Sequence, residues 1–163
     1  MKHLTLIRHA KSSWDTPTID KNRDLTIRGI KNAHAVAQEA HKYLPQINLI
    51  WSSTAKRAEE TALIFAQNLH WPMESIVFKD ELYTFDEREL AAIIKKCDDS
   101  YQNVIIFGHN EAITNFVNKF GDASIENVPT SGMVVLELPI DAWSHLQKGI
   151  TKKILFPRDL KHE

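Results

Sequence analysis

Short runs of apolar residues alternate along the chain with longer stretches in which apolar residues recur every three or four positions. The short runs predict buried β-strands at 3–7, 48–51, 76–78, 103–107, 133–138 and 151–156. The longer stretches predict one amphipathic helix between each successive pair of the first five strands. Strands that alternate with helices are typical of a mostly parallel sheet covered on both faces. We therefore expect a three-layer α/β/α fold with a mostly parallel sheet of about six strands.

Polar residues and one glycine mark where the predicted helices begin and end. Thr26 can cap a helix whose core-facing side begins with Ile27 and Ile30, because its hydroxyl can accept from a free N–H of the first turn. Asn110 stands in the corresponding position before the fourth predicted helix, and Gly121 follows the last apolar residue of that helix. Since glycine readily adopts left-handed backbone, Gly121 is expected to end the helix in that conformation.

Length and composition restrict the class of protein. The 163 residues, 43% hydrophobic and 25% charged, fit a single domain over residues 1–163 with a sizeable core. The formal net charge of −1 gives no reason to expect a nucleic acid or a membrane surface as a partner. No apolar run is long enough to span a bilayer, and no signal-peptide pattern opens the chain. We therefore expect a cytoplasmic protein, and the sequence does not indicate its oligomeric state.

Two arginines, two histidines and one carboxylate follow the ends of the first four predicted strands. Arg8 and His9 end the first strand, and Arg57 lies in the first turn of the helix that follows the second. Glu81 follows the third strand and His109 follows the fourth. In open sheets with parallel strands, ligands bind just beyond the carboxyl ends of the strands. We therefore expect these five side chains to gather at one edge of the sheet.

This set of residue types suits phosphoryl transfer. Arginine binds oxyanions with a rigid fork of donors, and Arg57 adds its charge to the positive end of a helix. A histidine such as His9 can attack phosphorus through a neutral ring nitrogen. A protonated His109 could donate to a phosphoryl oxygen, and Glu81 could protonate the leaving group. Each residue alone is more often an ordinary surface or structural side chain, so the convergence of all five carries the interpretation. No metal-site spacing is present, so we expect metal-independent chemistry without a cofactor.

Four motifs of the sequence resemble those of the histidine phosphatase superfamily, which also contains the cofactor-dependent phosphoglycerate mutases. Arg8-His9-Ala10-Lys11 resembles the signature that usually reads Arg-His-Gly. Arg23-Asp24-Leu25-Thr26-x-x-Gly29 resembles the start of the first helix of the family. Ser53-x-x-x-Arg57-Ala58-x-x-Thr61 resembles the second motif, and Gly108-His109 the second histidine. The motifs occur in the family's order over residues 8–109, and the resemblance implies a phosphoglycerate mutase-like fold.

The short chain and the Arg-His-Ala-Lys variant are most similar to the SixA-type phosphohistidine phosphatases. By this resemblance His9 is the nucleophile, and Arg8, Arg57 and His109 form the phosphate pocket. The phosphorylated histidine is then hydrolysed by water. Glu81 aligns with the acidic position of the family, and the expected substrate is phosphohistidine on a protein, such as a domain of a signalling relay.

Four further residues are candidates for contacts with the substrate. Lys11 and Arg23 are expected to flank the mouth of the pocket, where a cation can attract a phosphorylated substrate. Ser12 and Ser13 lie between them in the sequence and are expected to shape the entrance, together with Trp14.

Two other functions fit the same residues. A small-molecule phosphomonoesterase would be favoured by Glu81 poised in the pocket and by Lys11 and Arg23 lining a narrow mouth, whereas an open, shallow rim would favour a protein substrate. A phosphate-binding module without turnover would differ in that His9 never becomes phosphorylated. A mutase is less consistent with the sequence, because only about two dozen residues separate Arg57 from Glu81 and leave little room for additional helices.

Overall fold

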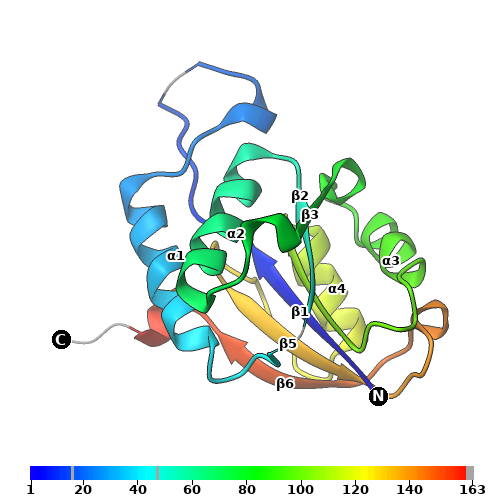
Figure 1. Ribbon diagram of the computed structural model, residues 1–163. Helices are drawn as coiled ribbons and strands as arrows, with labels where there is room; N and C mark the ends of the chain where they lie inside the picture. The colour runs from blue at the N-terminus through cyan, green and yellow to red at the C-terminus, as the bar shows by residue number, and fades with distance from the viewer. Residues whose placement is uncertain (16, 47, 161–163) are drawn as a thin grey trace.

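In the computed structural model, which describes residues 1–15, 17–46 and 48–160, a six-stranded sheet lies between two layers of helices (Figure 1). The strands are β1 (Lys2–Arg8), β2 (Leu49–Ser53), β3 (Ile76–Lys79), β4 (Asn103–Gly108), β5 (Met133–Leu138) and β6 (Ile150–Leu155). The α-helices are α1 (Ile27–Ala40), α2 (Lys56–Leu69), α3 (Glu87–Lys95) and α4 (Ala112–Phe120). The predicted three-layer fold is confirmed. Within the described ranges, none of the helices has the length and apolar character needed to cross a membrane.

The order of the strands determines which strand ends meet. The sheet runs β3-β2-β4-β1-β5-β6, and its first four strands are parallel to one another. The fifth strand, β5, is antiparallel to both of its neighbours, β1 and β6. The carboxyl ends of β1, β4 and β2 therefore lie side by side at the same edge. The end of β3 lies three strand spacings from β1, about 14 Å at about 4.8 Å per spacing.

Two hydrophobic cores separate the sheet from its helices. Helices α1 and α2 cover one face and pack on Ile7, Ile105 and Phe107, whereas α3 and α4 cover the other face and pack on Leu4 and Leu6, among other residues (Figure 1). Successive residues of a strand point to opposite faces, so the continuous apolar runs of β1 and β4 supply both cores. This burial holds the strand ends, and the polar residues beyond them, in fixed relative positions.

The start of α1 agrees with the sequence in its cap but not in its apolar face. Thr26 Oγ1 accepts a hydrogen bond from the Gly29 N–H at 2.9 Å, as predicted. Ile27 and Ile30 are exposed rather than core-facing. The first turn of α1 instead lies against the preceding loop, where a Cβ on Gly29 would come within 2.3 Å of the Lys11 carbonyl oxygen. The glycine is therefore required by close packing of the helix on this loop.

Both predicted ends of α4 need correction. The helix begins after Glu111, one residue later than expected, although Asn110 Oδ1 still accepts a hydrogen bond from the Thr114 N–H at 3.1 Å. Gly121 is extended, with φ −100° and ψ 176°, and is not left-handed. A Cβ at this position would lie 2.3 Å from the Thr151 hydroxyl oxygen. Glycine at residue 121 therefore permits close approach to β6 rather than a left-handed turn.

Candidate active site

A cavity of about 270 Å³ opens where β1 and β4 end. Its walls include Arg8, His9, Arg57 and His109, so four of the five side chains expected at this edge are brought together. The other described residues that line it are Lys11, Ser12, Trp14, Asp20, Arg23, Phe85, Asn110 and Thr130.

His9 is buried and its ring has one defined tautomer. Its Nδ1 atom lies 2.6 Å from the Ala10 carbonyl oxygen, which can only accept, so the proton is on Nδ1. The Nε2 atom therefore carries the lone pair, and the Nε–H of Arg57 donates to it at 3.3 Å. Burial lowers the pKa of His9 to about 3, with the Ala10 hydrogen bond acting against this shift and the charge of Arg57 adding to it. His9 is thus neutral at ordinary pH, which is the form that can act as a nucleophile.

Thr61 connects the strand end that carries His9 to the helix that carries Arg57. Its hydroxyl accepts a hydrogen bond from the Ala10 N–H at 2.9 Å and donates one to the Arg57 carbonyl oxygen at 2.7 Å. Ala10 packs with Leu25 and Ala33 and is not among the residues that line the cavity. The alanine that replaces the usual glycine therefore leaves the approach to His9 open.

Two guanidinium groups, that of the buried Arg57 and that of the half-buried Arg8, supply positive charge at the cavity. Arg57 is only 2% exposed and sits in the first turn of α2, where the helix dipole is also positive. Arg8 donates from one terminal nitrogen to the Val128 carbonyl oxygen at 3.0 Å, and its buried Nε has no hydrogen-bond partner among the described residues. Two like charges that are withdrawn from water side by side are costly unless an anion offsets them, and partial burial, followed by the charge of Arg57, lowers the pKa of Arg8. The pair is suited to binding an oxyanion.

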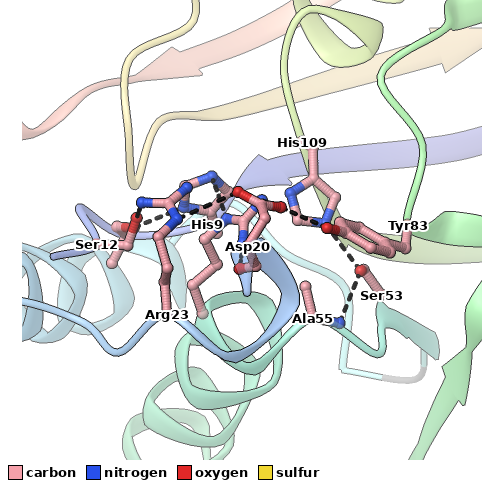
Figure 2. A network of polar contacts seen from close by, with 10 residues as sticks. His9, Ser12, Asp20, Arg23, Ser53, Ala55, Tyr83 and His109 are labelled. Carbon is pink, nitrogen blue, oxygen red and sulfur yellow. Dashed lines mark hydrogen bonds and ion pairs between the residues drawn. The ribbon is translucent and has the colours of Figure 1, made fainter. Parts of the chain in front are cut away.

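His109 faces His9 across the cavity, with ring centroids 5.2 Å apart. Its Nε2 atom lies 2.8 Å from the Ser53 hydroxyl oxygen, which also accepts a hydrogen bond from the Ala55 N–H at 3.1 Å (Figure 2). A hydroxyl can donate one hydrogen bond and accept two, so both tautomers of His109 satisfy these contacts. In the tautomer in which Ser53 donates its hydroxyl proton to Nε2, the ring proton of His109 lies on Nδ1. This Nδ1 is buried without a partner among the described residues and points to the side where His9 and Asp20 lie (Figure 2).

The charge of His109 differs from the expectation. Burial, followed by the charges of His9 and Arg57, lowers the pKa of His109 to about 2, so the ring is neutral rather than protonated. A neutral ring with its proton on Nδ1 still presents one donor to a phosphoryl oxygen, and a bound dianion would favour the protonated form.

Asp20 is a part of the site that the sequence did not reveal. It lies in the 3-10 turn η1 (Asp20–Asn22), within a polar loop that has no periodicity to mark it. Its carboxylate accepts hydrogen bonds from Arg57 at 3.0 Å, from Arg23 at 3.2 Å and from the Tyr83 hydroxyl (Figure 2). Partial burial acts to raise the pKa of Asp20, but the hydrogen bonds from Tyr83 and Arg57 outweigh it and lower the pKa to about 2. Asp20 is therefore ionised.

Three of the four predicted substrate contacts line the cavity. Lys11, Ser12 and Arg23 belong to its wall, and Arg23 both donates to the Ser12 hydroxyl and stacks on the Trp14 ring at 3.6 Å. Ser13 does not reach it. Its side chain lines a neighbouring hollow of about 540 Å³ between the loop and the start of α1, and its hydroxyl accepts from the Asp15 N–H at 3.0 Å.

Glu81 is not brought to the cavity. It lies in the 3-10 turn η3 (Asp80–Leu82) with an exposed side chain, because β3 is the edge strand and its end is remote from His9. The neighbouring Asp80 is also directed elsewhere and pairs with Lys21 at 3.4 Å. The segment after β3 contributes two aromatic residues instead. Phe85 lines the cavity, and Tyr83 donates to Asp20.

The described residues contain no group of three or more histidine, cysteine, aspartate or glutamate side chains placed to hold a metal ion.

Comparison with known proteins identifies the class to which this fold and site belong. The sequence model of the histidine phosphatase superfamily (branch 1) matches residues 4–86. A chloroplastic protein of Arabidopsis thaliana is 30% identical over 158 residues, which cover 87% of this chain and 69% of the relative. The chain therefore belongs to the histidine phosphatase superfamily, and it is a hydrolase with phosphatase activity.

Solved structures place the chain near SixA within that family. A candidate phosphohistidine phosphatase, SixA, from Agrobacterium tumefaciens is 28% identical, with a TM-score of 0.72 over 84% of this chain and 92% of that one. The protein histidine phosphatase SixA in complex with tungstate is 21% identical and shares the fold, with a TM-score of 0.81 over 98% of this chain and 99% of that one. The phosphoglycerate mutase-like fold and the resemblance to SixA are thereby confirmed.

Proposed function

We propose that the protein hydrolyses phosphohistidine on a protein substrate through a covalent phosphohistidine formed on Nε2 of His9. The observation that carries this proposal is the neutral His9, whose Nε2 lone pair faces a pocket formed by Arg8, Arg57 and His109. A neutral nucleophile beside two guanidinium groups is what attack on a phosphoryl dianion requires.

The reaction proceeds in two displacements. The phosphoryl oxygens accept hydrogen bonds from Arg8, Arg57 and the Nδ1–H of His109, while Nε2 of His9 attacks phosphorus. The new N–P bond forms as the bond to the leaving atom breaks, and that atom retains the electron pair. Water then attacks the same phosphorus, releases a proton to the solvent and displaces His9, which recovers its Nε2 lone pair as phosphate forms.

The carboxylates near the cavity favour a substrate that needs little acid catalysis. Among the described residues that line it, Asp20 is the only carboxylate, and it is ionised with a pKa of about 2. Glu81, the expected proton donor, is exposed and outside the cavity. An alkoxide leaving group depends strongly on such a donor. When the ring of a phosphohistidine is already protonated, it leaves as neutral imidazole and needs no such proton donor.

The size and rim of the cavity favour a protein substrate. Its volume of about 270 Å³ lies below the roughly 300–1,000 Å³ typical of small-molecule sites. Trp14 is 76% exposed and Phe85 is 52% exposed at its wall, so flat apolar surface is available to an imidazole ring presented by a partner. The 28% identity to the candidate phosphohistidine phosphatase of Agrobacterium tumefaciens points the same way.

A small-molecule phosphomonoesterase is the second candidate. The observation in its favour is that Lys11 and Arg23 line the cavity, where they would hold further acidic groups of a metabolite. Both functions require phosphorylation of His9. What distinguishes them is the preferred leaving group.

A rapid-quench experiment tests the proposal. The protein is mixed with a ³²P-labelled phosphohistidine protein and separately with an aryl phosphate, and acid-labile, base-stable label on the chain is followed together with released phosphate. We expect label on His9 and faster turnover of the phosphohistidine protein. His9→Ala should remove both label and turnover, whereas His41→Gln, at an exposed histidine, should change neither. Faster turnover of the aryl ester would support the second candidate, and absence of label would contradict covalent catalysis.

A further inference from the structure

The carboxylate of Asp20 occupies donors that the proposed reaction assigns to the phosphoryl group. The two terminal nitrogens of Arg57 both donate to Asp20, one to its carbonyl oxygen at 2.8 Å and the other to its carboxylate at 3.0 Å. The remaining nitrogen, Nε, donates to His9 at 3.3 Å. Each nitrogen of this guanidinium therefore donates one hydrogen bond within the protein, and two of the three donate to Asp20.

We propose that Asp20 is an internal competitor for the phosphoryl site, which holds Arg57 and Arg23 between turnovers and weakens the binding of substrate and product phosphate. A phosphoryl dianion and an ionised carboxylate repel each other strongly in a partly buried site, and they compete for the N–H groups that Asp20 now occupies. Phosphate therefore binds more favourably when the carboxylate turns away. The inference rests on the proposed function only in that this cavity receives a phosphoryl group.

The surroundings of Asp20 allow such a displacement without unfolding. The side chain of Asp20 is 39% exposed, whereas that of Arg57 is 2% exposed, so the carboxylate can turn toward solvent while the cation stays in place. The two chain segments on either side of the Asp20 loop are joined at its base, where the Ser13 N–H donates to the Asp24 carbonyl oxygen at 2.7 Å. The Asp20 carboxylate can therefore turn without breaking this hydrogen bond.

Tyr83 holds the carboxylate in its inward position. Its hydroxyl donates to the same carboxylate oxygen, Oδ2, that accepts from Arg57. Tyr83, in the segment after β3, thus contributes to the site by stabilising the inward position of Asp20. Loss of the hydroxyl should weaken the hold on Asp20 without changing the net charge of the cavity.

Calorimetric titration with inorganic phosphate, in the absence of any substrate, tests the inference. Asp20→Asn removes the charge and should tighten phosphate binding about tenfold, since one unit charge near the anion is lost. Tyr83→Phe should tighten binding by a smaller factor, about twofold to threefold. Asp15→Asn removes the same charge from an exposed position of the same loop and serves as the matched control, with an affinity close to that of the wild type.

The possible results separate this inference from the proposed function. If Asp20→Asn binds phosphate no more tightly than Asp15→Asn, Asp20 is not a competitor and the inference is wrong. A weaker affinity of Asp20→Asn would also overturn it, because Asp20 would then position Arg57 for the anion. Tighter binding by Asp20→Asn supports the inference even if the wild-type protein fails to turn over a phosphohistidine protein, and that failure would count against the proposed function alone.

Discussion

The Nδ1 atom of His9 lies 2.6 Å from the carbonyl oxygen of Ala10, the next residue in the chain. The acceptor belongs to the backbone, so the tautomer of His9 does not depend on which side chain residue 10 carries. Ala10 N–H is held in turn by Thr61, at 2.9 Å. The orientation of the nucleophile is therefore fixed by the turn that ends β1 and by one residue of α2.

The protonation state of His9 can be measured directly. Burial and the neighbouring arginines lower the pKa of His9 to about 3, so nitrogen-detected NMR should show a neutral ring with its proton on Nδ1 from pH 7.5 to pH 5. A titration of His9 near pH 6.5 would contradict the assignment of a neutral nucleophile.

Ser53 is expected to act as a positioning residue for His109. Ser53→Ala removes the partner of Nε2 and frees the ring to adopt the other tautomer, in which Nδ1 no longer donates to a phosphoryl oxygen. We expect kcat/KM to fall about 10-fold to 100-fold, with a change in the NMR signature of the His109 ring. Thr54→Ala, which alters an exposed contact with Asp80, is the matched control. An unchanged ring spectrum in Ser53→Ala would contradict this role.

The sequence predicted the fold and the centre of the site because both depend on local patterns. Buried parallel strands appear as continuous apolar runs, and the strand order places the ends of β1, β4 and β2 together. The motif residues Ser53 and Thr61 now have physical reasons, since Ser53 orients His109 and Thr61 joins the Ala10 N–H to the carbonyl oxygen of Arg57. These contacts join residues far apart in the chain, and spacing alone could not reveal them.

Prediction from the sequence failed for residues whose place at or away from the cavity depends on tertiary structure. Glu81 follows a strand in the same manner as His109, but nothing in the sequence marks β3 as the edge strand. Asp20 was missed for the opposite reason, because it lies in an irregular loop and reaches the cavity only through the fold of that loop. The signal that could have found it is an acidic residue three positions before Arg23, in the loop that joins two motifs each beginning with an arginine.

Removal of the Thr61 hydroxyl should destabilise the protein. Thr61→Val leaves the buried Ala10 N–H without its acceptor, so the free energy of unfolding should fall by about 1–3 kcal/mol. Thr61→Ser retains the hydroxyl and should recover most of the loss, apart from the missing methyl group. Urea unfolding of the three proteins measures this difference. A valine variant as stable as the wild type would show that the hydroxyl contributes nothing.

The two buried histidines should make stability depend on pH in a defined direction. The pKa values of His9 and His109 in the folded protein are about 3 and about 2, whereas the usual value in an unfolded chain is about 6.5. Below pH 6.5 the unfolded chain therefore binds protons that the folded protein does not. The free energy of unfolding should fall as the pH falls from 6.5 toward 3, by up to about 1.4 kcal/mol per pH unit for each histidine.

Urea unfolding at pH 7, 6 and 5 tests this dependence in a range where Asp20, with a pKa of about 2, contributes no change. His109→Gln removes one of the two groups, so its free energy of unfolding should fall less steeply with decreasing pH than that of the wild type. His9→Gln should behave in the same way, which allows for the case that either variant alone folds poorly. His41→Gln changes an exposed histidine outside the cavity and is the matched control, which should retain the wild-type slope. If the wild type and both buried-histidine variants showed the same slope, the neutral pair at the cavity would have to be abandoned. A His9 with the usual pKa of about 6.5 would be partly protonated close to neutral pH, and the protonated fraction has no Nε2 lone pair with which to attack phosphorus.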